Sequence, residues 1–132
     1  MGLTFAYRDP SPDIAFLWIG ENTRSMLGLW GRLTPYGTPL HKSHLAISVQ
    51  PQDLLEAGKR LNGLDVRTYN FAREETMEPS VIGWMPSAQL YFEDPDDHSL
   101  ELITLLHDDP DPSFIGSFGE WRTRPTTIHA HA

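Results

Sequence analysis

The stretch Gln89–Leu106, QLYFEDPDDHSLELITLL, predicts two strands joined by a tight acidic turn. Residues on both sides of the turn alternate with the period of two that is typical of a half-buried strand. Pro95 fixes one backbone angle in the turn, and the Asp side chains around it can bond the backbone. Glu101 lies between two leucines, so its carboxylate shares a face with Ser99 and Ile103. A carboxylate on a covered face must be paired, hydrogen-bonded or bound to a metal. The alternative is that this face is exposed to water.

The first half of the chain predicts three further strands. They are expected at residues 3–8, 14–19 and 25–30, where apolar and aromatic residues dominate. The second and third of them are paired through the ENTR hairpin. Residues 31–42 contain several Gly and Pro residues and predict a linker between two halves.

The second half predicts a strand, a helix and more strands. The strand covers residues 44–49, HLAISV, and a helix follows it at Pro51, a residue suited to a first helical turn. Gly63 is the expected C-cap of this helix. Residues 65–71 are expected to form a strand, and residues 81–85 to continue it or pair with it before the opening hairpin. One helical face is apolar and consists of Leu54, Ala57, Gly58 and Leu61.

Two segments of the second half lie outside this pattern. Glu74, Glu75 and Glu78 form a solvated charge run, unless their loop closes over a site. Residues 108–132 form a tail that begins with an acidic, Pro-rich break. The tail then predicts a short helix or hook that must dock, because free aromatic side chains need cover. Its apolar residues are Phe114, Ile115, Phe118 and Trp121.

Composition limits the classes of partner and compartment. The chain has 132 residues, which is enough for one domain with its own core. Its net charge of −8 argues against nucleic acid and anionic membranes as partners. It has no Cys, which excludes disulfides and thiolate chemistry, and no apolar run that approaches a membrane span. Its first residues, Met1-Gly2-Leu3, lack the charged-then-apolar order of a signal peptide. A soluble cytoplasmic protein is the expectation.

The order of AFLWIG, RSMLGLWG, HLAISV, GWMP and YFEDPDDHSLEL resembles the glyoxalase, bleomycin resistance and extradiol dioxygenase superfamily, whose members are called vicinal oxygen chelate proteins. The resemblance implies an α+β fold of paired βαβββ modules that form a cup. Residues 1–132 would be a single domain. Residues 3–42 would be a partial first module with its linker, lacking the initial strand and helix. Residues 43–107 would be a complete module and residues 108–132 a tail.

The same resemblance implies a metal site. By motif match, His44 and Glu101 are divalent-metal ligands, and Glu101 is also the catalytic residue that moves a proton. The family takes a further ligand from the first strand that this chain lacks, and a carboxylate from a position that falls here near Leu27 or Gly28, neither of which has a ligand atom. A third ligand is therefore expected from a partner chain or from one of two other histidines, which are otherwise surface or turn residues. These are His41 and His98.

A substrate pocket is a weaker prediction. Aromatic residues of the strands could line it, although such residues are more often plain core. They are Trp18, Trp30, Trp84 and Tyr91. His129 and His131 lie in the last residues and are expected to take no part in the site.

Two classes of function follow from the resemblance. The first is a lyase, isomerase or dioxygenase that uses Zn, Ni, Mn or Fe on a small oxygenated substrate. The second is a metal-free protein that sequesters a small molecule, with an inactive truncated member as a further alternative. Family members commonly form dimers, and an open sheet edge favours pairing, so a homodimer is expected.

Overall fold

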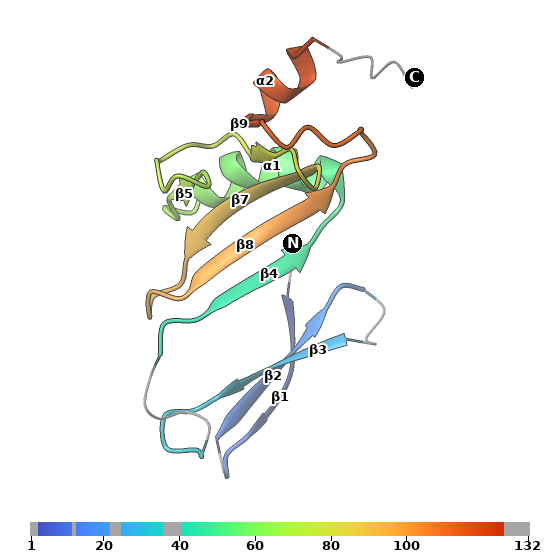
Figure 1. Ribbon diagram of the computed structural model, residues 1–132. Coiled ribbons are helices and arrows are strands. Elements are labelled where there is room, and N and C mark those ends of the chain that lie inside the picture. Colours follow the sequence, from blue (N-terminus) through green and yellow to red (C-terminus); the bar gives the residue numbers. More distant parts are fainter. Residues whose placement is uncertain (1–2, 12, 22–24, 36–40, 126–132) are drawn as a thin grey trace. The chain divides into compact units, whose positions relative to one another are not determined.

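The computed structural model describes residues 3–11, 13–21, 25–35 and 41–125. The chain forms two compact units, Met1–Ser43 and His44–Ala132, each with its own sheet (Figure 1).

The first unit is a three-stranded antiparallel sheet in the order β1-β2-β3. Its strands lie where the alternation predicted them: β1 (Leu3–Asp9), β2 (Ile14–Ile19) and β3 (Ser25–Trp30). The predicted ENTR hairpin between the last two includes residues 22–24, which are outside the described part of the chain.

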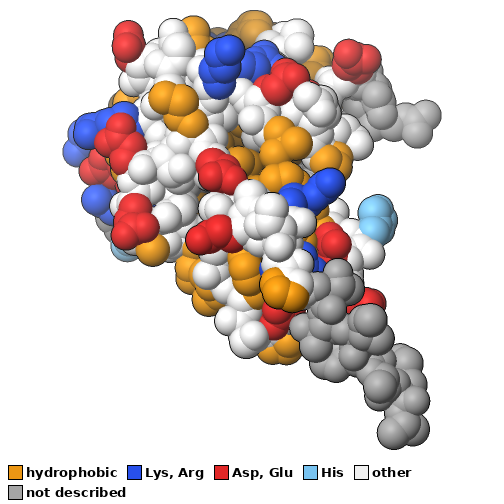
Figure 2. All heavy atoms as spheres, turned by 90° about the horizontal axis from the view of Figure 1, so that it is seen from above, with side chains coloured by type: hydrophobic (Ala, Val, Ile, Leu, Met, Phe, Trp, Pro, Cys, Tyr) orange, Lys and Arg blue, Asp and Glu red, His pale blue; other side chains and the backbone are white. Residues whose placement is uncertain are grey.

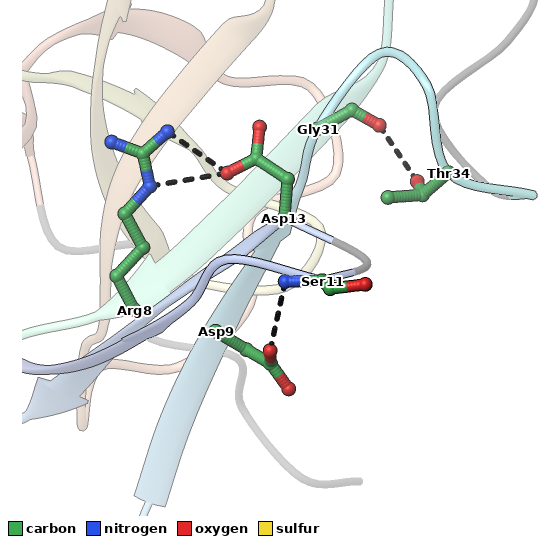
Figure 3. Close-up of polar contacts among 6 residues, drawn as sticks. All are labelled: Arg8, Asp9, Ser11, Asp13, Gly31 and Thr34. Atoms are coloured by element: carbon green, nitrogen blue, oxygen red, sulfur yellow. Dashed lines mark hydrogen bonds and ion pairs between the residues drawn. The ribbon is translucent and has the colours of Figure 1, made fainter.

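In the first unit, side-chain hydrogen bonds stabilise the turn that connects β1 and β2 (Figure 3). Asp13 adopts a left-handed φ of 77° and accepts hydrogen bonds from the Arg8 guanidinium at 2.9 and 3.1 Å. The Asp9 carboxylate accepts the Ser11 backbone N–H at 3.0 Å. The Gly31 N–H donates to the Asp13 carbonyl at 2.8 Å. Short polar side chains that bond the local backbone are the expected chemistry of such a turn.

The second unit is a mixed sheet in the order β4-β8-β7-β6-β9, with β5 paired to the C-terminal part of β7. β4 runs parallel to β8 and every other described pair is antiparallel. A parallel pair requires a crossover, and a helix is the first element of the chain between β4 and β8. The strands are β4 (His44–Ser48), β5 (Thr68–Tyr69), β6 (Ser80–Ile82), β7 (Ser87–Glu93), β8 (Ser99–Leu105) and β9 (Ile115–Ser117).

The helix α1 (Pro51–Asn62) covers one face of this sheet (Figure 1). Pro51 stands in its first turn, and Asp53 there complements the helix dipole. The predicted cap Gly63 follows the helix, but its φ of −65° is right-handed, so the position does not need glycine for its conformation. The core between helix and sheet consists of Leu54, Ala57, Val81, Ala88, Leu90, Leu102 and Trp121.

The strand expected at residues 65–71 is much shorter, and the prediction of its length was wrong. Only Thr68–Tyr69 pairs with β7, opposite Phe92 and Tyr91. The next part of the same edge of β7 is occupied by β6. The chain must therefore leave the edge after Tyr69, and a left-handed residue, Arg73, lies in the loop that follows.

The tail forms a strand as well as the short helix that its pattern predicted. β9 (Ile115–Ser117) pairs with β6, and α2 (Phe118–Thr123) follows at once. The Ser117 side chain and the Glu120 side chain cap the helix reciprocally. Trp121 is fully buried in the core. Neither described helix is long and apolar enough to cross a membrane.

Candidate functional site

Two neighbouring strands bring His44 and Glu101 together. β4 and β8 are parallel neighbours, with His44 opposite Ser99 and Ala46 opposite Glu101. Because side chains alternate along a strand, His44, Ala46 and Glu101 leave the same face. The buried core residue Leu102 leaves the other face, on which α1 packs. The site therefore lies on the sheet face opposite the helix.

The imidazole and the carboxylate are in direct contact. His44 Nε2 lies 2.8 Å from Glu101 Oε2. The Glu101 side chain is only 10% exposed, whereas the His44 side chain is 50% exposed. A nearly buried carboxylate is tolerated when it is hydrogen-bonded, and His44 provides that partner at an edge open to solvent.

Tyr91 holds the second oxygen of the same carboxylate. It lies directly opposite Glu101 in the β7–β8 pair, and its hydroxyl donates to Glu101 Oε1 at 3.3 Å. Burial raises the pKa of Tyr91 well above its ordinary 10.0, and the charge of Glu101 and the hydrogen bond to it raise it further. A bond from Gln89 partly opposes this rise in the Tyr91 pKa. The Tyr91 hydroxyl therefore stays protonated and remains a donor.

The contact between Tyr91 and Glu101 follows from the register of the β7–β8 hairpin, which the sequence of the turn indicates. The two strands pair so that Glu93 faces Ser99, which places Tyr91 opposite Glu101 two residues further along each strand. A turn centred on residues 94–98 implies that register. Sequence reasoning named Tyr91 only as an aromatic pocket residue and missed its bond to the carboxylate.

The donor atoms of His44 and Glu101 suit a divalent ion. In octahedral coordination with bonds of about 2.1 Å, two neighbouring ligand atoms lie about 3.0 Å apart, and the two atoms here are 2.8 Å apart. Imidazole nitrogen and carboxylate oxygen are both ligands of Zn, Ni, Mn and Fe. In the part of the chain that the structure describes, no group of three His, Asp or Glu residues could hold a metal.

The other predicted ligand positions belong to other elements of the chain. His98 is in the turn before β8, where its backbone N–H donates to Asp94 Oδ1 at 2.8 Å. His41, Leu27 and Gly28 belong to the first unit. His129 and His131 lie outside the described residues.

The predicted aromatic pocket residues are spread over both units. Trp18 and Trp30 belong to β2 and β3 of the first unit. Trp84 lies in the turn between β6 and β7 and is 62% exposed. Tyr91 contacts the His44–Glu101 pair within the second unit, with its ring centroid 6.2 Å from that of His44.

The chain matches no protein-family model and no curated protein sequence. Solved structures do resemble it. An integron cassette protein from the mobile metagenome of Halifax Harbour sewage outfall is 23% identical, with a TM-score of 0.64 over 79% of this chain and 78% of that one. A glyoxalase/bleomycin resistance protein/dioxygenase from Nocardioides is 19% identical, with a TM-score of 0.55 over 86% and 74%.

The fosfomycin resistance protein FosX from Listeria monocytogenes, solved with Mn(II) and sulfate, also resembles the chain. It is 21% identical, with a TM-score of 0.50 over 80% of this chain and 72% of that one. Similarities at this level of identity show a shared fold. The α+β fold predicted from the sequence is therefore confirmed.

Proposed function

Because the chain has the fold of the glyoxalase, bleomycin resistance and dioxygenase proteins, we propose that it is a divalent-metal-dependent lyase, isomerase or dioxygenase acting on a small oxygenated substrate. The observation that supports this most is the 2.8 Å contact between His44 Nε2 and Glu101 Oε2 on the sheet face opposite α1. One nitrogen and one carboxylate oxygen converge there from adjacent strands, with one side open to solvent.

In this proposal His44 and Glu101 hold the ion, which is Zn, Ni, Mn or Fe. Such an ion supplies Lewis-acid polarisation of neighbouring substrate oxygens. FosX, which shares the fold, was solved with Mn(II). Glu101 also moves a proton to or from the substrate, because its carboxylate lies next to the half-exposed side chain of His44.

Tyr91 positions the carboxylate. Its hydroxyl occupies Glu101 Oε1 at 3.3 Å, which leaves Oε2 directed at His44. The raised pKa of Tyr91 keeps this donor protonated across the pH range in which the site would work. Removal of the hydroxyl is therefore expected to loosen the carboxylate without removing a ligand.

A second candidate is a metal-free protein that binds a small molecule. The described residues include no group of three metal-binding side chains, and two protein ligands bind a divalent ion weakly. In this alternative the His44–Glu101 pair is a hydrogen-bonded dyad in the wall of a binding site.

Calorimetric titration with Mn²⁺, Ni²⁺, Zn²⁺ and Fe²⁺ distinguishes the two candidates. The wild-type chain is expected to bind one ion saturably, and Glu101→Gln and His44→Ala are each expected to weaken binding by roughly tenfold or more. Glu56→Gln, on the exposed side of α1, is the matched control and should leave binding unchanged. Absence of saturable binding, or binding that Glu101→Gln does not weaken, would favour the metal-free candidate.

We also propose that the protein forms a homodimer. Both faces of the three-stranded sheet of the first unit carry exposed apolar side chains: Phe5 and Leu29 on one face, Tyr7 and Met26 on the other. Apolar side chains also lie between acidic and basic ones on the face shown in Figure 2. Exposed apolar patches commonly mark interfaces. Sedimentation equilibrium at micromolar concentration tests this, and a monomer would contradict it.

A further inference from the structure

A half-open cavity of about 280 Å³ lies in the second unit, at the β6 and β9 side of the sheet. Its walls come from the loop between β5 and β6 and from the β9–α2 corner. Ser80 and Ser117, which are paired across β6 and β9, contribute hydroxyl groups, and Phe71 and Ile115 contribute apolar surface. A volume of this size accommodates one ring with a short substituent.

Ser80 and Ser117, two lining residues of the cavity, lie on the same sheet face as Glu101. Ser80 lies opposite Gln89, and Gln89 and Tyr91 leave the same face of β7 because they are two residues apart. The Phe71 ring, a wall of the cavity, lies 6.4 Å from the Tyr91 ring, whose hydroxyl bonds Glu101. β6 and β8 are two strand spacings apart, about 10 Å. The cavity and the His44–Glu101 pair therefore lie about two strand spacings apart on one sheet face, with Gln89 and Tyr91 of β7 between them.

The described lining of the cavity is acidic. It includes Glu74, Glu78 and Glu120, and no Lys, Arg or His is among the lining residues in the described part of the chain. Each of the three accepts a hydrogen bond from a neutral donor, and these donors are the Asn70 amide, the Gly119 N–H and the Ser117 N–H. A neutral donor does not cancel a negative charge, so the cavity attracts cations and repels anions.

We propose that this cavity receives the part of the substrate remote from its reacting oxygens, and that it selects an uncharged or amine-bearing group over a carboxylate or phosphate. The proposal rests on the proposed function for the reacting end. The apolar surfaces of Phe71 and Ile115 contact the body of this group, and the three carboxylates favour a group that carries no negative charge. Sequence reasoning saw Glu74 and Glu78 only as a solvated charge run unless their loop closed over a site, and the structure places both beside this cavity.

Two pairs of probes test the proposal by calorimetry. Dopamine and 3-(3,4-dihydroxyphenyl)propionate share a catechol and differ in the charge of the tail, and they are compared with Mn²⁺ present. 2-Phenylethylamine and 3-phenylpropionate lack the catechol and are compared without metal. The wild-type chain is expected to bind each amine about tenfold more tightly than its acid, since three carboxylates near a surface act together.

The variant Glu74→Gln, Glu78→Gln and Glu120→Gln removes the charges but keeps an amide oxygen for each hydrogen bond. It is expected to reduce the preference to about twofold or less. The matched control is Glu56→Gln, Asp65→Asn and Asp109→Asn, which changes the net charge equally at exposed positions outside the cavity. This control is expected to keep the preference.

Three results would overturn the proposal: equal binding of amine and acid, equal loss of preference in the control, or no binding of 2-phenylethylamine at roughly 10 mM, where even weak sites fill. The metal-free pair separates this proposal from the proposed function. If Glu101→Gln leaves metal binding unchanged while the preference for 2-phenylethylamine persists, the metal proposal fails and the cavity proposal stands.

Discussion

Replacement of Gly58 by alanine is expected to destabilise the second unit by about 2 kcal/mol. Gly58 is buried in the interior of α1. A Cβ built there would lie 1.9 Å from the Met77 carbonyl oxygen and 2.7 Å from the Met77 carbonyl carbon. Real Cβ atoms essentially never approach closer than 3.0 Å, so the helix and the loop must separate by at least 1.1 Å at this point.

The magnitude follows from two opposing effects. Alanine is a better helix former than glycine by about 1 kcal/mol. Overpacking against well-packed neighbours costs about 1–3 kcal/mol, and the upper end applies because both contacting atoms are backbone. The Asn62 amide also donates to the Gly58 carbonyl at 2.8 Å and to the Thr68 hydroxyl, so a shift of the helix strains this connection to β5.

Gly63→Ala is the matched control at the end of the same helix. The φ of Gly63 is −65°, which alanine adopts without strain, and the nearest atom to a new Cβ is the Lys59 carbonyl oxygen at 3.3 Å. This variant is expected to change stability by less than about 1 kcal/mol in either direction.

Urea unfolding followed by far-ultraviolet circular dichroism measures both variants. The two described helices belong to the second unit, so the helical signal reports on that unit. Gly58→Ala should also weaken 2-phenylethylamine binding, because Thr76 and Glu78 on either side of Met77 line the cavity. A Gly58→Ala variant as stable as Gly63→Ala would refute the close packing of helix and loop.

Two further predictions concern the tail and the site. Trp121→Ala is expected to cost about 3–5 kcal/mol in urea unfolding, because Trp121 is fully buried against Phe114; a loss below about 1 kcal/mol would show that the tail is not part of the core. Tyr91→Phe is expected to flatten the fall in stability above pH 10.0, the ordinary pKa of tyrosine. The raised pKa keeps the folded Tyr91 protonated while the unfolded chain ionises, so its contribution is intact below that pH and is lost as the pH rises further. Unfolding free energies measured below and above pH 10.0 check this, and identical pH dependence in the two chains would contradict it.

The local sequence pattern was sufficient to predict those strands and helices whose positions depend only on their own residues. The strands at 14–19 and 25–30 and the opening hairpin lie where alternation and turn residues placed them. The start of α1 at Pro51 follows from the same kind of local chemistry. The fold class followed because the order of these elements matched a known pattern, and the solved structures confirm it.

The local sequence pattern could not predict where strands end or which distant segments come into contact. The length of β5 depends on where β6 takes over the edge of β7, and β9 forms because β6 offers a free edge to the tail. Neither fact is visible in the residues of β5 or β9 themselves. A strand extends only as far as its backbone hydrogen-bonds to a neighbouring strand, so both strands of a pair determine where each one begins and ends.

By itself the sequence determined that His44 opens one strand and Glu101 lies within another, and which neighbours share a face with each side chain. Only the tertiary structure decided that β4 and β8 are parallel neighbours, which brings His44 Nε2 within 2.8 Å of Glu101 Oε2 across 57 positions of chain. It also decided that Glu74, Glu78 and Glu120 line one cavity. The physical reason is that periodicity specifies the direction of a side chain, whereas proximity depends on the register of strands that the chain joins only after folding.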